Sequence, residues 1–75
     1  MKKELNLIME ILDNSISFQL HHISYRIDGG YLEVYSKDSR HFSATKLIGT
    51  IEGIDHVGCY MEYNEKLDKV VLVIF

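Results

Sequence analysis

The last seven residues constrain the fold of this chain more than any other segment. Residues 69–75 have the sequence KVVLVIF, which is apolar after the first residue and mostly β-branched. This composition favours a β-strand over a helix. Alternate side chains of a strand point to opposite faces, so Val71 and Val73 share one face while Leu72 and Ile74 share the other. Both faces of this strand are therefore apolar, and we expect each to be covered by other parts of the chain or by a second copy.

The length of the chain limits how much apolar surface it can bury. A chain of 75 residues buries only about 60% of the surface that its unfolded form exposes, so its stability margin is small. We interpret residues 1–75 as a single domain. The single cysteine, Cys59, cannot form an internal disulfide, which favours a reducing compartment such as the cytoplasm. Neither a signal peptide nor a membrane span is expected from the apolar segments.

The first half of the chain has the pattern of a helix followed by a hairpin. Apolar residues recur at the helical period over residues 1–13, and Asn14 is expected to end this helix. Apolar and polar residues alternate in residues 15–20 and again in 23–27, but the apolar residues have even numbers in the first segment and odd numbers in the second. This pattern predicts a strand that is interrupted by a bulge or corner at His21-His22. Asp28-Gly29-Gly30 predicts a hairpin turn, because glycine accepts positive φ, and a second strand follows at 31–36.

The second half repeats this order. A helical period covers residues 44–54, with Ser43 as the expected N-cap and Ser39 as the alternative. Residues 57–63 alternate, and a polar turn at 64–68 leads into the terminal strand. The sequence thus predicts an α+β fold of the order helix, hairpin, helix, hairpin (αββαββ), with a four-stranded antiparallel sheet and two helices on one face. We expect a face-to-face homodimer to cover the bare face; in the alternative, a helix or the first hairpin curls over it.

Two glycines interrupt the second helix, and each costs about 1 kcal/mol relative to alanine. We expect Gly53 to be the C-terminal cap, and Thr45, Gly49 and Gly53 to form a flat ridge for close packing. Residues 47–53 (LIGTIEG) resemble the opening of the helix motif in LAGLIDADG homing endonucleases. That resemblance implies close helix packing through both glycines and a repeated helix–hairpin unit. The position of the family's metal-binding acid is Ile54 here, so we assign no nuclease activity.

The titratable residues do not match the pattern of a metal or catalytic site. His21 and His22 are adjacent, so on a strand they would point to opposite faces. His56 and Cys59 have no second pair of ligands nearby in sequence. The carboxylates are scattered and none stands in an apolar context typical of a general acid. We therefore expect no catalytic residue, metal or cofactor.

Three functions fit these observations. The first is a non-catalytic binding protein that regulates or inhibits a protein partner as a homodimer, using the apolar and aromatic residues Tyr25, Tyr31, Tyr35, Tyr60, Leu72 and Ile74. The second is anion or nucleic-acid binding through the basic residues Lys37, Arg40, His41 and Lys46 near the start of the second helix. The net charge of −3 disfavours a broad nucleic-acid surface. The third is a regulatory module that holds a small ligand in the dimer seam.

Overall fold

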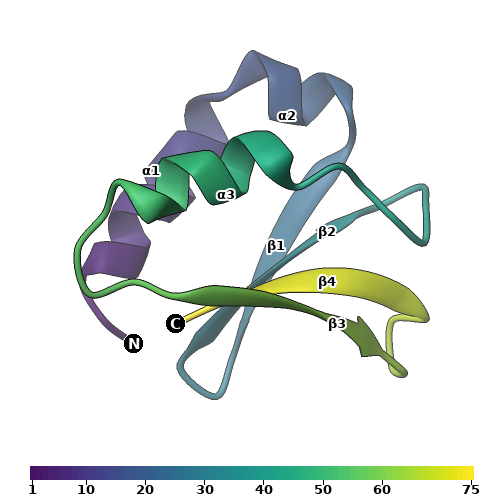
Figure 1. Cartoon of the computed structure of the whole chain (residues 1–75). Coiled ribbons are helices and arrows are strands. Elements are labelled where there is room, and N and C mark those ends of the chain that lie inside the picture. The colour runs from purple at the N-terminus through teal and green to yellow at the C-terminus, as the bar shows by residue number, and fades with distance from the viewer.

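The computed structural model describes all residues 1–75, as helices packed on a strongly twisted sheet (Figure 1). In chain order the elements are α1 (Glu4–Asn14), α2 (Ile16–Leu20), β1 (Ile23–Asp28), β2 (Tyr31–Ser36), α3 (Thr45–Glu52), β3 (Cys59–Asn64) and β4 (Lys69–Ile74). The strands pair antiparallel in the order β1-β2-β4-β3. The α+β class and the four-stranded antiparallel sheet are confirmed, but the chain has three helices where two were predicted.

The apolar core lies between the helices and one face of the sheet. The three helices lie on the same side of the sheet in Figure 1. The buried residues that meet there come from all three helices, from the residue before α3 and from the two central strands: Leu5, Ile8, Leu12, Phe18, Ala44, Leu47, Ile51, Leu32, Val34, Leu72 and Ile74. This face is the helix face of the sheet, and its opposite is the open face.

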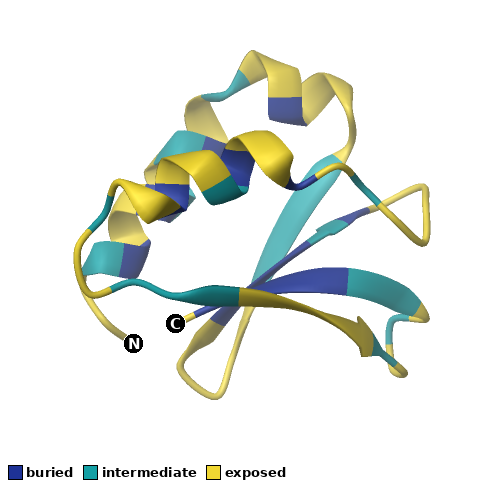
Figure 2. Cartoon of the chain, in the orientation of Figure 1, coloured by how far each residue is buried: buried dark blue, intermediate teal, exposed yellow.

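The terminal strand β4 occupies the interior of the sheet, between β2 and β3. Its side chains Leu72 and Ile74 are buried on the helix face, while Val71 and Val73 are buried on the open face. Figure 2 shows a buried stretch, in dark blue, along β4. The expectation that both faces of this strand are covered is confirmed. On the open face, register places Val73 between Glu33 and Tyr60 and places Val71 opposite Glu62. Both valines are buried in a single copy, so their burial does not require a second one.

The segment 15–20 was predicted to be a strand, and this prediction is wrong, because it forms α2. The Ser15 Oγ accepts a hydrogen bond from the Phe18 backbone N–H at 3.3 Å and caps the helix. In this helix only Phe18 turns into the core, while Ile16 and Leu20 point to solvent. The chain turns at His21-His22, where His22 has a φ of 57°, but this turn joins α2 to β1 and does not interrupt a strand as predicted.

The β1–β2 turn forms as the sequence predicts, with Gly29 and Gly30 at φ values of 60° and 88°. The start of α3 differs from the prediction. Ala44 is the N-cap residue and no side chain caps the helix, so Ser43 does not have the expected role. This end of α3 therefore keeps free backbone amides.

The glycine ridge of α3 does not pack against another backbone. Added at Gly49, a Cβ atom would meet nothing within 4 Å, so the expectation of close approach there is wrong. Gly53 is the C-cap residue, as predicted, and its N–H donates to the carbonyls of Thr50 and Ile51. The close helix packing implied by the resemblance to LAGLIDADG endonucleases is absent at Gly49.

Candidate functional site

An aromatic cluster occupies part of the open face. The Tyr31 and Phe75 rings meet edge to face, with centroids 6.3 Å apart and an interplanar angle of 83°. The Tyr60 and Phe75 rings lie 5.9 Å apart at 51°. Tyr31, Tyr60 and Phe75 are 48%, 46% and 40% exposed, although each ring contacts a neighbour. We call these three residues the aromatic cluster. They form a partly exposed apolar surface in which the Phe75 ring contacts both tyrosine rings.

A buried carboxylate lies beside this cluster. Glu33 is buried on the open face, and register places Val73 between it and Tyr60. The Arg26 Nε atom donates to Glu33 Oε1 at 2.6 Å, and Asn64 Nδ2 donates to Glu33 Oε2 at 3.4 Å. The hydrogen bond with Glu33 raises the pKa of Arg26. Each oxygen of the Glu33 carboxylate thus accepts a hydrogen bond. Glu33 therefore has the environment of a structural ion pair rather than that of a general acid.

The outer edge of β3 is unpaired. Gly58 and Phe75 exchange both backbone hydrogen bonds, at 2.8 and 3.0 Å. Hydrogen-bonded and non-hydrogen-bonded pairs alternate along antiparallel strands, so Cys59, Met61 and Tyr63 direct their N–H and C=O groups away from β4. Met61 and Tyr63 are also 40% and 56% exposed on the helix face.

We call the outward backbone of β3 together with the side chains of Tyr60, Met61 and Tyr63 the β3 edge. It exposes large apolar side chains on both faces of a strand with free backbone groups. This combination can add a further strand to the sheet by main-chain hydrogen bonds.

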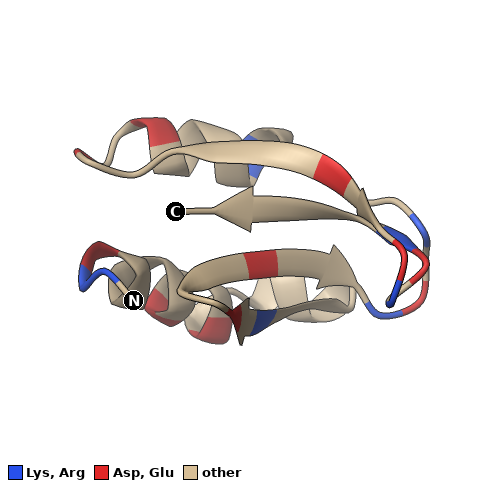
Figure 3. Ribbon diagram, turned by 90° about the horizontal axis from the view of Figure 1, so that it is seen from below, with Lys and Arg blue, Asp and Glu red and all other residues tan.

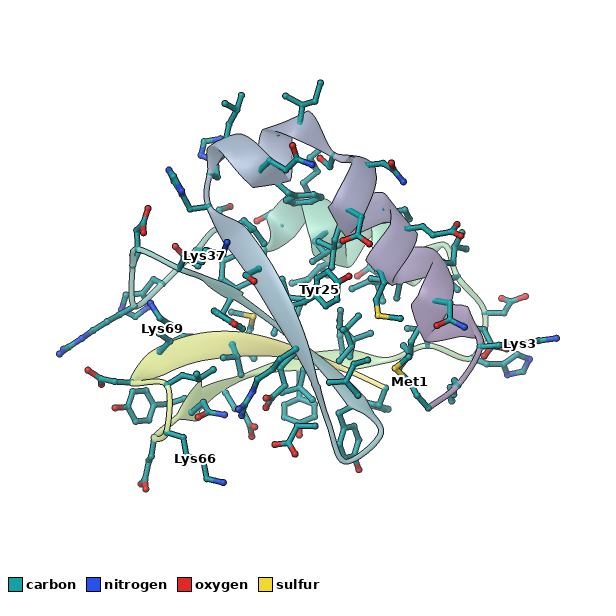
Figure 4. All side chains as sticks on the ribbon, turned by 180° about the vertical axis from the view of Figure 1, so that it is seen from behind. Met1, Lys3, Tyr25, Lys37, Lys66 and Lys69 are labelled. Carbon is teal, nitrogen blue, oxygen red and sulfur yellow. The ribbon has the colours of Figure 1, made fainter.

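The six predicted protein-binding residues do not form one surface. Tyr31 and Tyr60 belong to the aromatic cluster, and Tyr35 is half-buried on the open face. Leu72 and Ile74 are fully buried under the helices, so neither is available to a partner. Tyr25 lies on the helix face, where its hydroxyl donates to Asp13 Oδ1 at 2.9 Å (Figure 4).

Sequence reasoning missed Phe75, Met61 and Tyr63 as surface residues. Strand order decides their exposure, because β3 lies at an edge only once β4 is placed between β2 and β3. The alternation of residues 57–63 was visible in the sequence, but alternation gives the two faces of a strand and not its neighbours.

A cavity of about 370 Å³ lies between α2, the loop 37–44 and the start of α3. Three of its ten lining residues are apolar: Phe18, Ile23 and Phe42. The other seven form its polar wall and all carry side-chain N–H or O–H groups: Ser17, His21, Ser36, Ser39, His41, Ser43 and Lys46. No carboxylate lines it, so the cavity offers donors to an acceptor-rich ligand.

The predicted basic group is divided. His41 and Lys46 line the cavity. Arg40 instead forms an ion pair with Asp68, with Nη2 2.9 Å from Oδ2. The carbonyl of Lys37 accepts a hydrogen bond from Lys69 Nζ at 3.2 Å, and Figure 4 shows both lysines at the left end of the molecule. The four residues therefore do not present one basic surface, and Figure 3 shows acidic and basic residues mixed at this end.

The Asp68 carboxylate joins the two turns at that end. Its Oδ1 accepts from the Tyr63 hydroxyl and its Oδ2 pairs with Arg40. The hydrogen bond from Tyr63, and then the charge of Arg40, lower the pKa of Asp68 below its ordinary value. These contacts fix the 37–44 loop to the β3–β4 turn.

Other reactive groups are not assembled into a centre. No group of three histidine, cysteine or acidic side chains could hold a metal ion. Cys59 is half-buried, and burial, followed by the charge of Glu52, raises the pKa of its thiol. No helix of the chain has the length and apolarity that crossing a membrane requires.

Comparison with known proteins gives a negative result. No protein-family model, curated protein or solved structure matches this chain. The function proposed below therefore rests on the contacts, exposure and charges of the chain itself.

Proposed function

We propose that this chain is a non-catalytic binding protein that dimerises through the β3 edge and regulates or inhibits a protein partner through the open face. The observation that carries the proposal is the β3 edge itself. Its backbone groups are unpaired, while Tyr60 is exposed on the open face and Met61 and Tyr63 are exposed on the helix face. Strand addition would satisfy the backbone and cover apolar side chains on both faces at once.

A second copy of the chain is the occupant that the β3 edge favours. Natural sheets protect a free edge with proline, bulges or lysine, and residues 59–64 (CYMEYN) contain none of these. Glu62 is their only charged residue. A chain of this size also gains stability by association, because its own core is small.

Charge and symmetry together limit the registers open to this pairing. A two-fold axis perpendicular to the sheet sets opposite each other residues whose side chains are on the same face, so the axis passes midway between the two copies of one residue. An axis at Glu62 would set two carboxylates opposite each other, which is destabilising. With the axis at Met61, Glu62 lies opposite Tyr60 of the other copy, and Cys59 lies opposite Tyr63. We propose this register.

The proposed dimer places the aromatic clusters of both copies on one continuous open face. Aromatic residues with a polar tip are frequent anchors of protein interfaces, because they combine contact area with few rotatable bonds. Tyr31 and Tyr60 have this character. The paired open faces form the surface proposed for a protein partner.

This arrangement replaces the face-to-face homodimer expected from the sequence. That expectation relied on bare apolar side chains of β4, but Val71 and Val73 are buried within one copy. A nucleic-acid function has less support, because Arg40 is paired with Asp68 and the basic residues are divided.

Disulfide trapping tests the proposed register. In a Cys59→Ser background, Met61→Cys sets two thiols opposite each other at a two-fold axis, within the Cα separation that a disulfide spans. Mild oxidation is expected to give a covalent dimer. Tyr63→Cys in the same background is the matched control, since its two thiols would lie four residues apart along the strands. Efficient crosslinking of the control, or none with Met61→Cys, would contradict the register.

Differential capture tests the partner surface. Wild-type chain and Tyr31→Ser are compared as baits, with Leu7→Ser as control because Leu7 is a half-exposed apolar residue of α1, on the other side of the molecule. A specific partner is expected to be retained by wild type and Leu7→Ser and lost by Tyr31→Ser. Equal retention by all three would rule out the open face as its binding surface.

A further inference from the structure

We propose that the cavity between α2, the loop 37–44 and α3 binds a small organic phosphate, namely a phosphate monoester that carries an apolar group. The cavity volume of about 370 Å³ lies within the range of small-molecule sites. It is a mixed site, in which Phe18, Ile23 and Phe42 supply apolar walls and the polar wall supplies donors. A ligand that fits has an apolar part and an anionic part.

A buried serine points to an acceptor in the ligand. Ser36 is only 5% exposed and lines the cavity. Its Oγ accepts hydrogen bonds from the backbone N–H groups of Asp38 and Ser39, at 3.3 and 3.2 Å. Both contacts use its lone pairs, and no acceptor in the chain receives its hydroxyl hydrogen. A ligand oxygen would complete its hydrogen bonds.

The charge around the cavity favours an anion. Lys46 and His41 lie at its exposed rim, and no acidic side chain lines it. The nearest acidic residue in the loop, Asp38, pairs with His22, with Oδ2 3.3 Å from Nδ1. The positive charge of Lys46 at the rim therefore has no lining carboxylate to neutralise it.

The start of α3 adds to this preference. Ala44 makes no capping hydrogen bond and Lys46 lies in the first turn of the helix. Free amides at a helix start attract anions through the helix dipole. A phosphate monoester has three terminal oxygens and a carboxylate has two. The phosphate can therefore accept more hydrogen bonds from the seven side chains of the polar wall.

This proposal does not depend on the dimer. The cavity is lined by residues from α2, β1, β2 and the following loop and helix, and none from β3. Either proposal can fail without the other.

Phenyl phosphate and inorganic phosphate are the probes, added separately to the full-length ¹⁵N-labelled chain and followed by amide NMR shifts. Phenyl phosphate is expected to shift amides of Ser36, Ser39 and Lys46 and to bind several-fold more tightly than inorganic phosphate, because the apolar walls contact its ring. Lys46→Ala is expected to weaken phenyl phosphate binding about tenfold. Lys66→Ala, which removes an exposed lysine from the β3–β4 turn, is the matched control and should bind as wild type.

Four outcomes would overturn the proposal: no shifts, shifts confined to residues outside the cavity, equal affinity for both probes, or equal weakening by Lys46→Ala and Lys66→Ala. A third titration uses a short single-stranded oligonucleotide. Salt-sensitive binding of the oligonucleotide at these amides, with no binding of phenyl phosphate, would also overturn it in favour of a nucleic-acid site.

Discussion

Gly58 and Phe75 form a close pair at the end of the β3–β4 hairpin. Their backbones exchange two hydrogen bonds, and the Phe75 ring lies over Gly58 so closely that a Cβ atom there would be 2.8 Å from the ring. The absence of a side chain at residue 58 therefore leaves the space that the Phe75 ring occupies. Since Tyr31 and Tyr60 both contact this ring, the pair sets the geometry of the aromatic cluster.

Gly58→Ala is expected to displace the Phe75 ring without unfolding the chain. The atoms that clash belong to the far side of a partly exposed ring, which can rotate away. The free energy of unfolding should change by about 1 kcal/mol or less. Nuclear Overhauser contacts between the Tyr31 and Phe75 rings measure the displacement. Their persistence at wild-type strength would contradict this account of Gly58.

Leu72→Ala is expected to destabilise the chain strongly. Leu72 is fully buried at the centre of the core, and removing its side-chain atoms leaves a cavity that costs about 3 kcal/mol. Leu7→Ala makes the same chemical change at a half-exposed position of α1 and should cost well under half as much. Urea unfolding of both variants makes the comparison. Equal losses would mean that Leu72 does not occupy the core.

Arg26→Met tests the ion pair on the open face. The variant leaves Glu33 buried with only the 3.4 Å contact from Asn64, so the urea midpoint should fall. Replacing both partners, as Arg26→Met with Glu33→Met, should recover most of the loss because no buried charge remains unpaired. A double variant that is less stable than the single one would contradict the cost assigned here to the unpaired Glu33 carboxylate.

Acid should weaken the end of the molecule held by Asp68. The hydrogen bond from Tyr63 and the charge of Arg40 lower the pKa of Asp68 in the folded chain, so its contribution to stability is complete above the ordinary value of 3.8. That contribution is lost as the pH falls below 3.8 and through the lowered pKa. Asp68→Asn removes the titrating group and retains a residue that tolerates the φ of 53° at this position. Thermal unfolding of wild type should therefore show an acid-dependent loss in this range that the variant lacks.

Much of the fold could be predicted because alternation and turn residues are local signals. The hairpin at Gly29-Gly30 and the apolar strand β4 follow from residue types alone. Residues 15–20 show the limit of this reasoning. Ile16, Phe18 and Leu20 alternate as a strand does, but in a helix of one and a half turns only Phe18 needs to be buried. The available signal was Ser15, three residues before the amide that it caps.

The candidate sites were harder to predict, since each depends on contacts between distant segments. The cavity needs α2, so the wrong strand prediction hid the contribution of Ser17 and His21. Arg40 was grouped with its sequence neighbours, but its partner Asp68 comes from the other hairpin. The β3 edge follows from strand order, which the sequence pattern does not specify.

The central claim is that copies of this chain associate through the β3 edge. Light scattering coupled to size-exclusion chromatography measures it directly, with wild type compared with Met61→Lys and with Ile27→Lys as matched control. Ile27 is 53% exposed on β1, the opposite edge strand. We predict dimeric wild type, dimeric Ile27→Lys and monomeric Met61→Lys, because only at the β3 edge would the proposed register set the two introduced charges opposite each other. Wild type that stays monomeric at high concentration, or Met61→Lys that stays dimeric, would contradict the account.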